Sequence, residues 1–429
     1  MDASTTAVSF REALSVWFKV GCLGFGGPAG QIALMHRILV DEKKWIDEPR
    51  YLHALNFCML LPGPEAQKLA TYAGWLLHGM RGGLAAGILF VLPGALVMLA
   101  ISVLYVLGRG VPVVDGALFG IKAAVLVIVV EALIRIGRRS LKSSLLIALA
   151  GLAFVGIFFF EVPFPLIVLI AGIVGFFLAE PAAVPPSAAI PGRWRQAAIA
   201  LAAGLVLWWA PVALSVLALG TEHVFADIGI FFSKLAIVSF GGAYALLAYM
   251  AQQAVETYGW MSAPEMVDGL GFAETLPGPL IKVTQFVGFL GAYRSPEPFG
   301  PLTSAVLGSA LTTWVTFVPP MMLIFAGAPF VEQLRANRRL SGALAAITAA
   351  VVGVILNLTI WFVLHVLFAE VTEMRAGPLR WYAFDPASID LKVSALALVA
   401  AALAFWLHRG LVELVATMAA LGIAVRFLS

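Results

Sequence analysis

The sequence predicts an all-α polytopic membrane protein of about 13 transmembrane helices, in two inverted-topology repeats with Gly/Pro-broken helices. Three observations lead to this prediction: the composition, a series of long apolar stretches, and a pair of Gly/Pro motifs that occurs twice. Of the 429 residues, 61% are hydrophobic and only 12% are charged, whereas a soluble domain carries about 25% charged residues. A surface so poor in charge is suited to lipid rather than to water.

The apolar stretches give the number of spans, because a transmembrane helix needs about 20 mostly apolar residues. Seven stretches contain no Asp, Glu, Lys or Arg: 82–108, 143–160, 162–179, 196–221, 235–255, 298–331 and 340–369. Six less uniform stretches are also candidates: 10–35, 51–80, 113–134, 264–293, 392–407 and 410–426.

Two motifs recur at the same spacing, which indicates an internal duplication. Phe-Gly-Gly at 25–27 recurs at 240–242, and Pro-Gly-Pro at 62–64 recurs at 277–279; both offsets are 215 (240 − 25 and 277 − 62). The proline-rich segment 180–195 reads as the joint between the halves. We therefore predict a first repeat at 1–180, a linker with an extra transmembrane helix at 181–222, and a second repeat at 223–429.

The basic residues predict how the halves are oriented, because Lys and Arg gather in cytoplasmic loops. A basic cluster at 135–142 follows the helix that starts near Gly116, whereas the cluster at 335–339 precedes the matching helix at Gly342. If both clusters are cytoplasmic, the matching helices run in opposite directions and the repeat is inverted. The N-terminus is then cytoplasmic, although the loop 37–50 places some basic residues outside.

The repeated motifs predict breaks in four membrane helices, because proline removes a backbone donor and glycine relaxes the backbone. Non-helical backbone at membrane depth is tolerated where it is buried in protein or lines a cavity. Each break starts a new half-helix, whose N-terminus offers free N–H groups and about half a positive charge. Such an end is an anion site, and nearby lysines add full charges that are costly in a membrane without a partner or a task.

We predict that the repeated motifs and their lysines bind an anion. These residues are Lys19, Gly26, Gly27, Pro62, Gly63, Pro64, Lys68, Lys234, Gly241, Gly242, Pro277, Gly278, Pro279 and Lys282. Three alternatives stay open. Lys19 and Lys234 could extend to the membrane interface, Glu65 and Lys68 could form a structural ion pair at i, i+3, and Glu274 could be a helix-end charge in water.

Other ligand classes find no support in the sequence. The six histidines show no metal-binding spacing, there is no nucleotide-binding GxxxxGK[ST] motif, and the net charge of +3 comes without a basic stripe for nucleic acid. We expect no metal, no cofactor and no nucleic-acid partner. The expected partners are an oxyanion and the lipid bilayer, with a homodimer as an open alternative.

The motifs together resemble the chromate ion transporter (CHR) family in its long-chain, two-domain form. The resemblance rests on Phe18-Lys19-Val20-Gly21 with the motif at 25–28, on the segment 60–64 with Gln67-Lys68, and on their second-half counterparts. It implies a multi-pass protein of a bacterial or archaeal plasma membrane that exports chromate and confers chromate resistance. One departure is that Met59 stands where the second half has Glu274, so the halves are not functionally equivalent.

Export of a dianion is also favoured by the membrane potential. One charge moving through 100 mV is worth about 2.3 kcal/mol, so a dianion leaving an inside-negative cell gains about 4.6 kcal/mol. In a secondary transporter of this kind, Glu65 and Glu274 are candidates for proton coupling or gating. Transport of sulfate or a related anion is the alternative. An intramembrane lipid-phosphate enzyme is a remote one, because the histidines are scattered.

Overall fold

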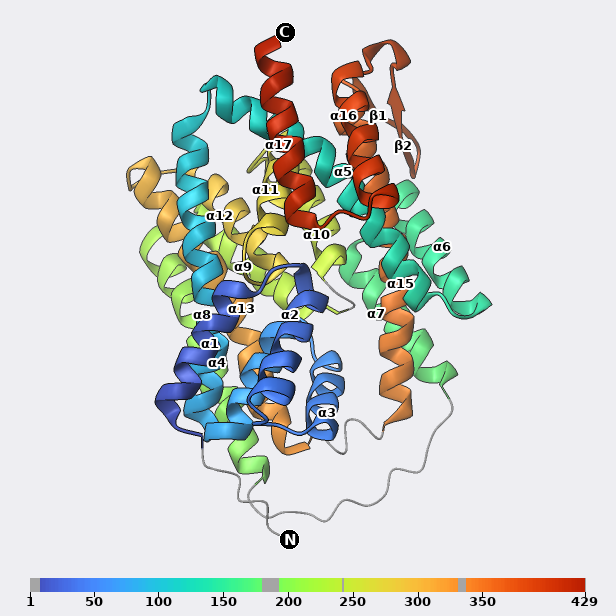
Figure 1. Cartoon of the computed structure of the whole chain (residues 1–429). Helices are drawn as coiled ribbons and strands as arrows, with labels where there is room; N and C mark the ends of the chain where they lie inside the picture. Colours follow the sequence, from blue (N-terminus) through green and yellow to red (C-terminus); the bar gives the residue numbers. More distant parts are fainter. Residues whose placement is uncertain (1–7, 180–192, 241–242, 331–336, 429) are drawn as a thin grey trace. The chain divides into compact units, whose positions relative to one another are not determined.

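The computed structural model describes residues 8–179, 193–240, 243–330 and 337–428, which form helices and one small β-hairpin (Figure 1). The chain divides into two compact units, and each unit contains segments of both sequence halves. The first unit comprises Met1–Ala100, Glu180–Gly242 and Leu276–Ser341, and the second comprises Ile101–Ala179, Ala243–Thr275 and Gly342–Ser429.

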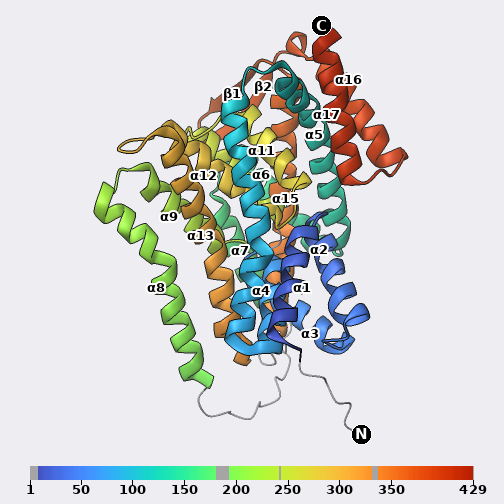
Figure 2. The same cartoon turned by 60° about the vertical axis from the view of Figure 1, so that its left-hand side comes forward.

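The first unit contains most of the broken helices. Its elements are α1 (Phe10–Leu23), α2 (Gly27–His36), the π-helical turn η1 (Arg37–Glu42), α3 (Glu48–Met59), the first part of α4 (Glu65–Gly108), α8 (Arg193–Leu219), α9 (Val224–Ile237), η3 (Leu280–Lys282), α12 (Val283–Arg294), α13 (Pro301–Gly327) and η4 (Ala328–Phe330). Side-chain caps stabilise the starts of α1, α3 and α9: the Asp47 side chain, for example, accepts a hydrogen bond from the backbone N–H of Arg50 at 2.8 Å. The helix α8 packs along α13 (Figure 2), where Trp314 Nε1 donates to the carbonyl of Leu207 at 2.7 Å.

The second unit contains the rest of α4 and the C-terminal elements. They are α5 (Pro112–Ser140), α6 (Ser144–Phe160), α7 (Phe164–Leu178), α10 (Ala243–Gln252), η2 (Gln253–Thr257), α11 (Ala263–Thr275), α15 (Arg338–Leu367), β1 (Val371–Ala376), β2 (Leu379–Phe384), η5 (Pro386–Ser388), α16 (Leu391–Ala401), η6 (Ala402–Trp406) and α17 (Leu411–Leu428). The core of this unit lies where α16 and α17 pack against α5.

Within the described residues, six helices are long and apolar enough to cross a membrane. They are Glu65–Gly108, Pro112–Ser140, Trp194–Leu219, Pro301–Phe330, Arg338–Leu367 and Leu411–Leu428. The prediction of a mainly helical membrane protein is therefore confirmed, while the count of 13 spans stays a prediction. The stretch 82–108 proves to belong to α4, which contains a non-helical turn at His78 and Gly79, where the φ of Gly79 is +59°.

One small β-hairpin accompanies the helices of this all-α membrane protein. The strands β1 and β2 pair antiparallel from Val371↔Phe384 to Ala376↔Leu379, and Gly377 supplies the positive φ (+59°) that a two-residue hairpin turn requires. The hairpin occupies the short segment between two predicted spans. Hydropathy alone does not detect such a segment, because its strands are largely exposed.

The duplication seen in the sequence is repeated in the secondary structure. The order α1, α2, η1, α3 matches the order α9, α10, η2, α11, with every boundary within one residue of the offset of 215. Even the π-helical turn recurs: the N–H of Lys43 donates to Ile38 O, and the N–H of Tyr258 donates to Gln253 O, both at 2.9 Å. Two copies of one sequence pattern therefore form the same succession of elements.

Helices of one half pack on helices of the other within the second unit. At Gly116 and Gly422, α5 of the first half lies against α17 of the second, so that a side chain on Gly116 would approach the Cα of Ile423 to 2.9 Å. At Gly175 and Gly342, α7 of the first half lies against α15 of the second.

Candidate functional site

The four predicted helix breaks are present, and glycines with positive φ shape the three whose glycines belong to the described residues. The chain leaves the helix between α1 and α2, where the φ of Gly26 is +82°, and between α3 and α4, where the φ of Gly63 is +107°. The second half breaks between α9 and α10 and again between α11 and η3, where the φ of Gly278 is +92°. L-residues with a side chain rarely adopt such angles, so the motif glycines permit the breaks.

The breaks pair crosswise within the first unit through two equivalent hydrogen bonds. The N–H of Gly63 donates to the carbonyl of Ser239 at 3.0 Å, and the N–H of Gly278 donates to the carbonyl of Gly24 at 2.9 Å. Gly63 and Gly278 are 215 residues apart, and so are Gly24 and Ser239. The Pro-Gly-Pro segment of each half therefore contacts the end of the first helix of the other half, as a local two-fold relation requires.

Two further helices close on these segments at equivalent places. A side chain on Gly63 would come within 2.7 Å of Pro320 Cβ in α13, and a side chain on Gly94 in α4 would overlap the carbonyl oxygen of Pro277. Both helices carry proline here, at Pro93 and Pro320. The backbone of each Pro-Gly-Pro segment is thus in direct contact with a proline-containing helix.

Two lysines are buried beside the breaks in equivalent positions. Lys68 and Lys282 each have 1% of their surface exposed. The Lys68 ammonium donates to the carbonyl of Leu61, and the Lys282 ammonium donates to the carbonyls of Leu276 at 2.9 Å and Gly278 at 3.3 Å. Leu61 and Leu276 are 215 residues apart, and each follows a helix end, where carbonyl groups lack intrahelical partners.

The interior of this unit carries positive charge. Among the described residues of the first unit, the buried charged side chains are the two lysines, and no carboxylate is buried. Glu65 is half-buried and acts on Lys68 electrostatically, but the described atoms place no ion pair between them. The structural ion pair left open as an alternative is therefore not formed, and Lys68 binds a backbone carbonyl instead.

Three buried glutamines surround the breaks, and sequence reasoning missed their role. Gln31 Nε2 donates to the carbonyls of Gly24 at 3.1 Å and Gly278 at 2.7 Å, so it joins the two halves. Gln67 Nε2 donates to Phe317 O and Gln285 Nε2 to Ala95 O, each at 3.0 Å. In the described structure, the Oε1 atom of each glutamine is buried without a hydrogen-bond partner. The only signal in the sequence was the occurrence of amides in apolar segments next to the motifs.

The remaining predicted residues lie in varied positions. Lys19 and Lys234 are exposed on α1 and α9, Gly26 is exposed, and Gly27 is half-buried. Pro62, Pro64 and Pro277 are half-buried and Pro279 is buried, whereas Gly241 and Gly242 lie outside the described residues. Glu274 belongs to the second unit, where it is buried and accepts a hydrogen bond from the Tyr244 hydroxyl at 2.6 Å.

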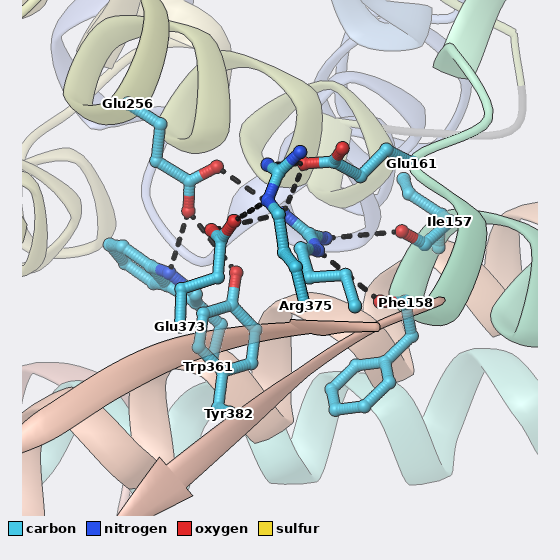
Figure 3. Close-up of polar contacts among 9 residues, drawn as sticks. Ile157, Phe158, Glu161, Glu256, Trp361, Glu373, Arg375 and Tyr382 are labelled. Carbon is cyan, nitrogen blue, oxygen red and sulfur yellow. Dashed lines mark hydrogen bonds and ion pairs between the residues drawn. The ribbon is translucent and has the colours of Figure 1, made fainter. Parts of the chain in front are cut away.

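A second polar cluster lies in the second unit and anchors the β-hairpin (Figure 3). Arg380 of β2 is 2% exposed, and its Nη1 lies 3.2 Å from Glu161, 3.6 Å from Glu256 and 3.8 Å from Glu373. Arg375 of β1 pairs with Glu161 at 2.7 Å and with Glu373 at 2.6 Å. Three carboxylates here face two guanidinium groups, so this cluster is poorly suited to an anion, and its contacts explain how the hairpin is held.

The described residues contain no group of three or more His, Cys, Asp or Glu side chains that could hold a metal ion. The chemistry of the first unit is therefore that of backbone amides, amide side chains and two ammonium groups. These are the donors that bind oxyanions in proteins.

Comparisons with known proteins agree with this chemistry. The family model described as chromate transporter matches residues 11–176 and 226–425. The chain is 34% identical over 365 residues to a chromate transport protein of Pseudomonas aeruginosa, covering 82% of each chain. It is 27% identical over 348 residues to a chromate transport protein of Cupriavidus metallidurans, covering 81% of each chain. It is also 27% identical over 350 residues to a probable chromate transport protein of Synechococcus elongatus, covering 81% of this chain and 83% of the relative.

No solved structure matches the chain. The family matches confirm the resemblance drawn from the motifs and identify a transporter rather than an enzyme. Together with the apolar helices, they make the protein a multi-pass membrane protein. The chain belongs to the chromate transporter family.

Proposed function

We propose that this protein is a secondary transporter that carries chromate across the membrane. The observation that carries the proposal is the pair of equivalent buried lysines, Lys68 and Lys282, beside crosswise-paired helix breaks in a unit whose described residues contain no buried carboxylate. The names of the relatives, chromate transport proteins, support chromate as the cargo. In this proposal the two ammonium groups and the N-terminal N–H groups of α4 and α12 attract the dianion.

We further propose that the two halves form inverted repeats with about 13 spans, in the plasma membrane, with the N-terminus in the cytoplasm. The reciprocal hydrogen bonds from Gly63 to Ser239 and from Gly278 to Gly24 support a two-fold relation between the halves. The basic clusters at 135–142 and 335–339 support opposite directions for the matching helices. Lys19, Lys234 and the glycines 26, 27, 241 and 242 also belong to the proposed substrate-binding residues. The proposed repeats divide at 1–180 and 223–429.

The direction of transport follows from the charge of the cargo. An inside-negative potential of 100 mV favours exit of a dianion by about 4.6 kcal/mol, which corresponds to about a thousandfold concentration ratio. Export therefore needs no nucleotide hydrolysis, and it would lower the chromate concentration in the cell and confer resistance. Sulfate has the same charge and shape, so transport of sulfate or a related anion is the alternative, and competition between the two anions for flux decides it.

The test is chromate flux into or out of proteoliposomes under a set membrane potential. Replacing Lys68 or Lys282 with alanine should lower flux about ten- to a hundredfold, because a hydrogen bond to a charged group contributes about 1.5–3 kcal/mol. The matched control is Lys392→Ala, because Lys392 is exposed on α16; its flux should equal that of the wild type. Folding of each variant is checked by size-exclusion chromatography and by thermal unfolding.

Unchanged flux in folded Lys68→Ala and Lys282→Ala proteins would remove the lysines from the site. Strong inhibition by excess sulfate, with faster sulfate flux, would assign the cargo to sulfate instead of chromate. Potential-driven chromate flux that sulfate barely inhibits is the expected result.

A further inference from the structure

The buried carboxylates of the second unit break the symmetry between the halves. Among the described residues there are three, Glu265, Asp268 and Glu274, and all lie on α11. At the offset of 215 the matching residues of α3 are Arg50, His53 and Met59, so the first half carries no acid at any of these positions. An ionisable side chain inside a membrane protein is costly to keep. Three buried acids on a helix of only one half point to a task that the other half lacks.

Asp268 differs from the other two acids in its hydrogen bonds. Its Oδ2 accepts a hydrogen bond from the Tyr105 hydroxyl at 2.9 Å, and Arg109 Nη1 in turn donates to that hydroxyl oxygen at 2.7 Å. Asp268 is 1% exposed, and its Oδ1 has no hydrogen-bond partner in the described structure. A buried carboxylate oxygen without a donor carries a desolvation penalty of about 1–3 kcal/mol or more.

The other two acids have evident structural partners. Glu265 accepts hydrogen bonds from the N–H and the hydroxyl of Ser262, which caps the start of α11. Glu274 accepts a hydrogen bond from the hydroxyl of Tyr244. Asp268 is therefore the acid of α11 with a buried carboxylate oxygen, Oδ1, that accepts no hydrogen bond in the described structure.

Charged groups reach Asp268 from each element around it. Lys122 acts on it from α5, Arg109 from the end of α4, and Glu265 from its own helix. The helix α17 also packs on α11, but its ionisable residues Glu413 and Arg426 are exposed and are not among the groups that act on Asp268. The Asp268 carboxylate is therefore buried and hydrogen-bonded to Tyr105, while Lys122 and Arg109 act on it electrostatically and, among the described residues, form no ion pair with it.

A proton fits this site better than a metal ion does. Calcium needs six to eight oxygen ligands and magnesium an octahedral shell, and no group of three or more potential ligand residues occurs among the described residues. A single proton needs only one oxygen. It also removes the buried charge, while the hydrogen bond from Tyr105 to Oδ2 is retained.

We propose that Asp268 binds a proton on Oδ1 and that its protonation couples anion transport to the pH gradient. The step is a reversible proton transfer. The carboxylate takes up a proton from one side of the membrane and becomes a carboxylic acid, and it later releases the proton to the other side. Tyr105 and Arg109 are positioning residues. Tyr105 donates a hydrogen bond to Oδ2 and Arg109 donates one to the Tyr105 hydroxyl, which leaves Oδ1 to bind the proton. This inference rests on the proposed transport function, and the test separates the two.

The experiment uses proteoliposomes in which potassium and valinomycin hold the membrane potential at zero. Exchange of chromate at equal pH on both sides measures transport alone. The steady-state chromate distribution under a gradient of one pH unit measures coupling, and one coupled proton should shift it about tenfold, since one pH unit corresponds to 1.36 kcal/mol. Asp268→Asn should retain exchange at equal pH and lose the tenfold shift, whereas Glu413→Gln, the exposed acid-to-amide control, should retain both.

Infrared spectroscopy gives a readout that does not depend on the cargo. Titration of the purified protein should show a carboxylic acid band that disappears in Asp268→Asn, keeps its intensity in Glu413→Gln and shifts in Tyr105→Phe. Chromate exchange without any effect of the pH gradient would overturn the inference and leave the transport function intact. A chromate distribution that responds to a sodium gradient instead, or a carboxylic acid band unchanged in Asp268→Asn, would also overturn the inference. Absence of chromate exchange in the wild type would overturn the proposed function. The infrared titration would still decide whether Asp268 binds the proton.

Discussion

The close contact between the Pro-Gly-Pro segment and α13 makes Gly63→Ala the most informative single substitution. Gly63 has a φ of +107°, and a side chain there would lie within 2.7 Å of Pro320 Cβ. Two costs then add. A residue with a side chain in a sparsely populated backbone region costs about 1–3 kcal/mol, and overpacking a filled interior costs about 1–3 kcal/mol more. The expected loss of stability is about 2–6 kcal/mol.

Gly27→Ala is the matched control for this prediction. Gly27 also has a positive φ (+66°), but a side chain there would meet nothing within 4 Å. The control therefore carries the backbone cost without the clash. The packing of Gly63 against Pro320 contributes about 1–3 kcal/mol to the difference between the two variants. The φ of Gly63 lies outside the left-handed helical region that Gly27 occupies, and this adds to the difference in the same direction.

The assay is thermal unfolding of both variants in the same detergent, followed by tryptophan fluorescence. Gly63→Ala should melt several degrees below Gly27→Ala, because a loss of 1 kcal/mol shifts the Tm by about 2–4 °C in proteins of 150–250 residues and by less in larger ones. Equal melting temperatures for the two variants would refute the close contact between the helix break and α13.

Two more predictions concern polar contacts outside the breaks. Arg380→Met should destabilise the second unit by about 3 kcal/mol, near the low end for a broken buried pair, because its three carboxylate partners are partly exposed. Arg375→Met removes an exposed guanidinium and should change stability far less. Equal losses in chemical denaturation would contradict the anchoring role of Arg380. His36, the last residue of α2, has its pKa raised above 6.5 by the hydrogen bond to the Glu48 carboxylate. Its stabilising contribution is therefore complete below pH 6.5 and is lost as the pH rises through the raised value. The wild type should therefore lose more thermal stability than His36→Gln between pH 6 and pH 8, and parallel pH profiles would contradict this.

The sequence predicted the helix breaks well because glycine and proline act locally. Phe-Gly-Gly and Pro-Gly-Pro change the backbone wherever they occur, so the four breaks lie where the motifs are. The offset of 215 also predicted which residues would be equivalent. The carbonyls of Leu61 and Leu276 each accept a hydrogen bond from the corresponding lysine.

The partners of the motifs could not be predicted in the same way. That Gly63 binds Ser239 and Gly278 binds Gly24 depends on how two distant segments fold together, and no local pattern specifies such a pairing. The chain alternates between the two units, so that each unit contains segments of both halves. This, too, is a tertiary property. The equivalence of Gly24 and Ser239 as small residues before Phe-Gly-Gly was the one signal that could have indicated it.

The lysines illustrate where hydropathy reasoning stops. The repeated motifs made all four nearby lysines candidates for the anion site, with the membrane interface as the alternative for Lys19 and Lys234. In the structure Lys68 and Lys282 are buried whereas Lys19 and Lys234 are exposed. Burial depends on which face of a helix meets its neighbours. The glutamines Gln31, Gln67 and Gln285 were missed for the same reason, because an amide in an apolar segment has no fixed direction until the helices pack.

The central claim is that Lys68 and Lys282 form the charged centre of a chromate transport site. Its most direct test is the rate of chromate flux in proteoliposomes at a set membrane potential, compared among the wild type, Lys282→Ala and Lys392→Ala. The account predicts flux that grows with the potential in the wild type and in Lys392→Ala, and flux reduced about ten- to a hundredfold in folded Lys282→Ala. Equal flux in all three proteins, or no chromate flux in folded wild-type protein, would contradict it.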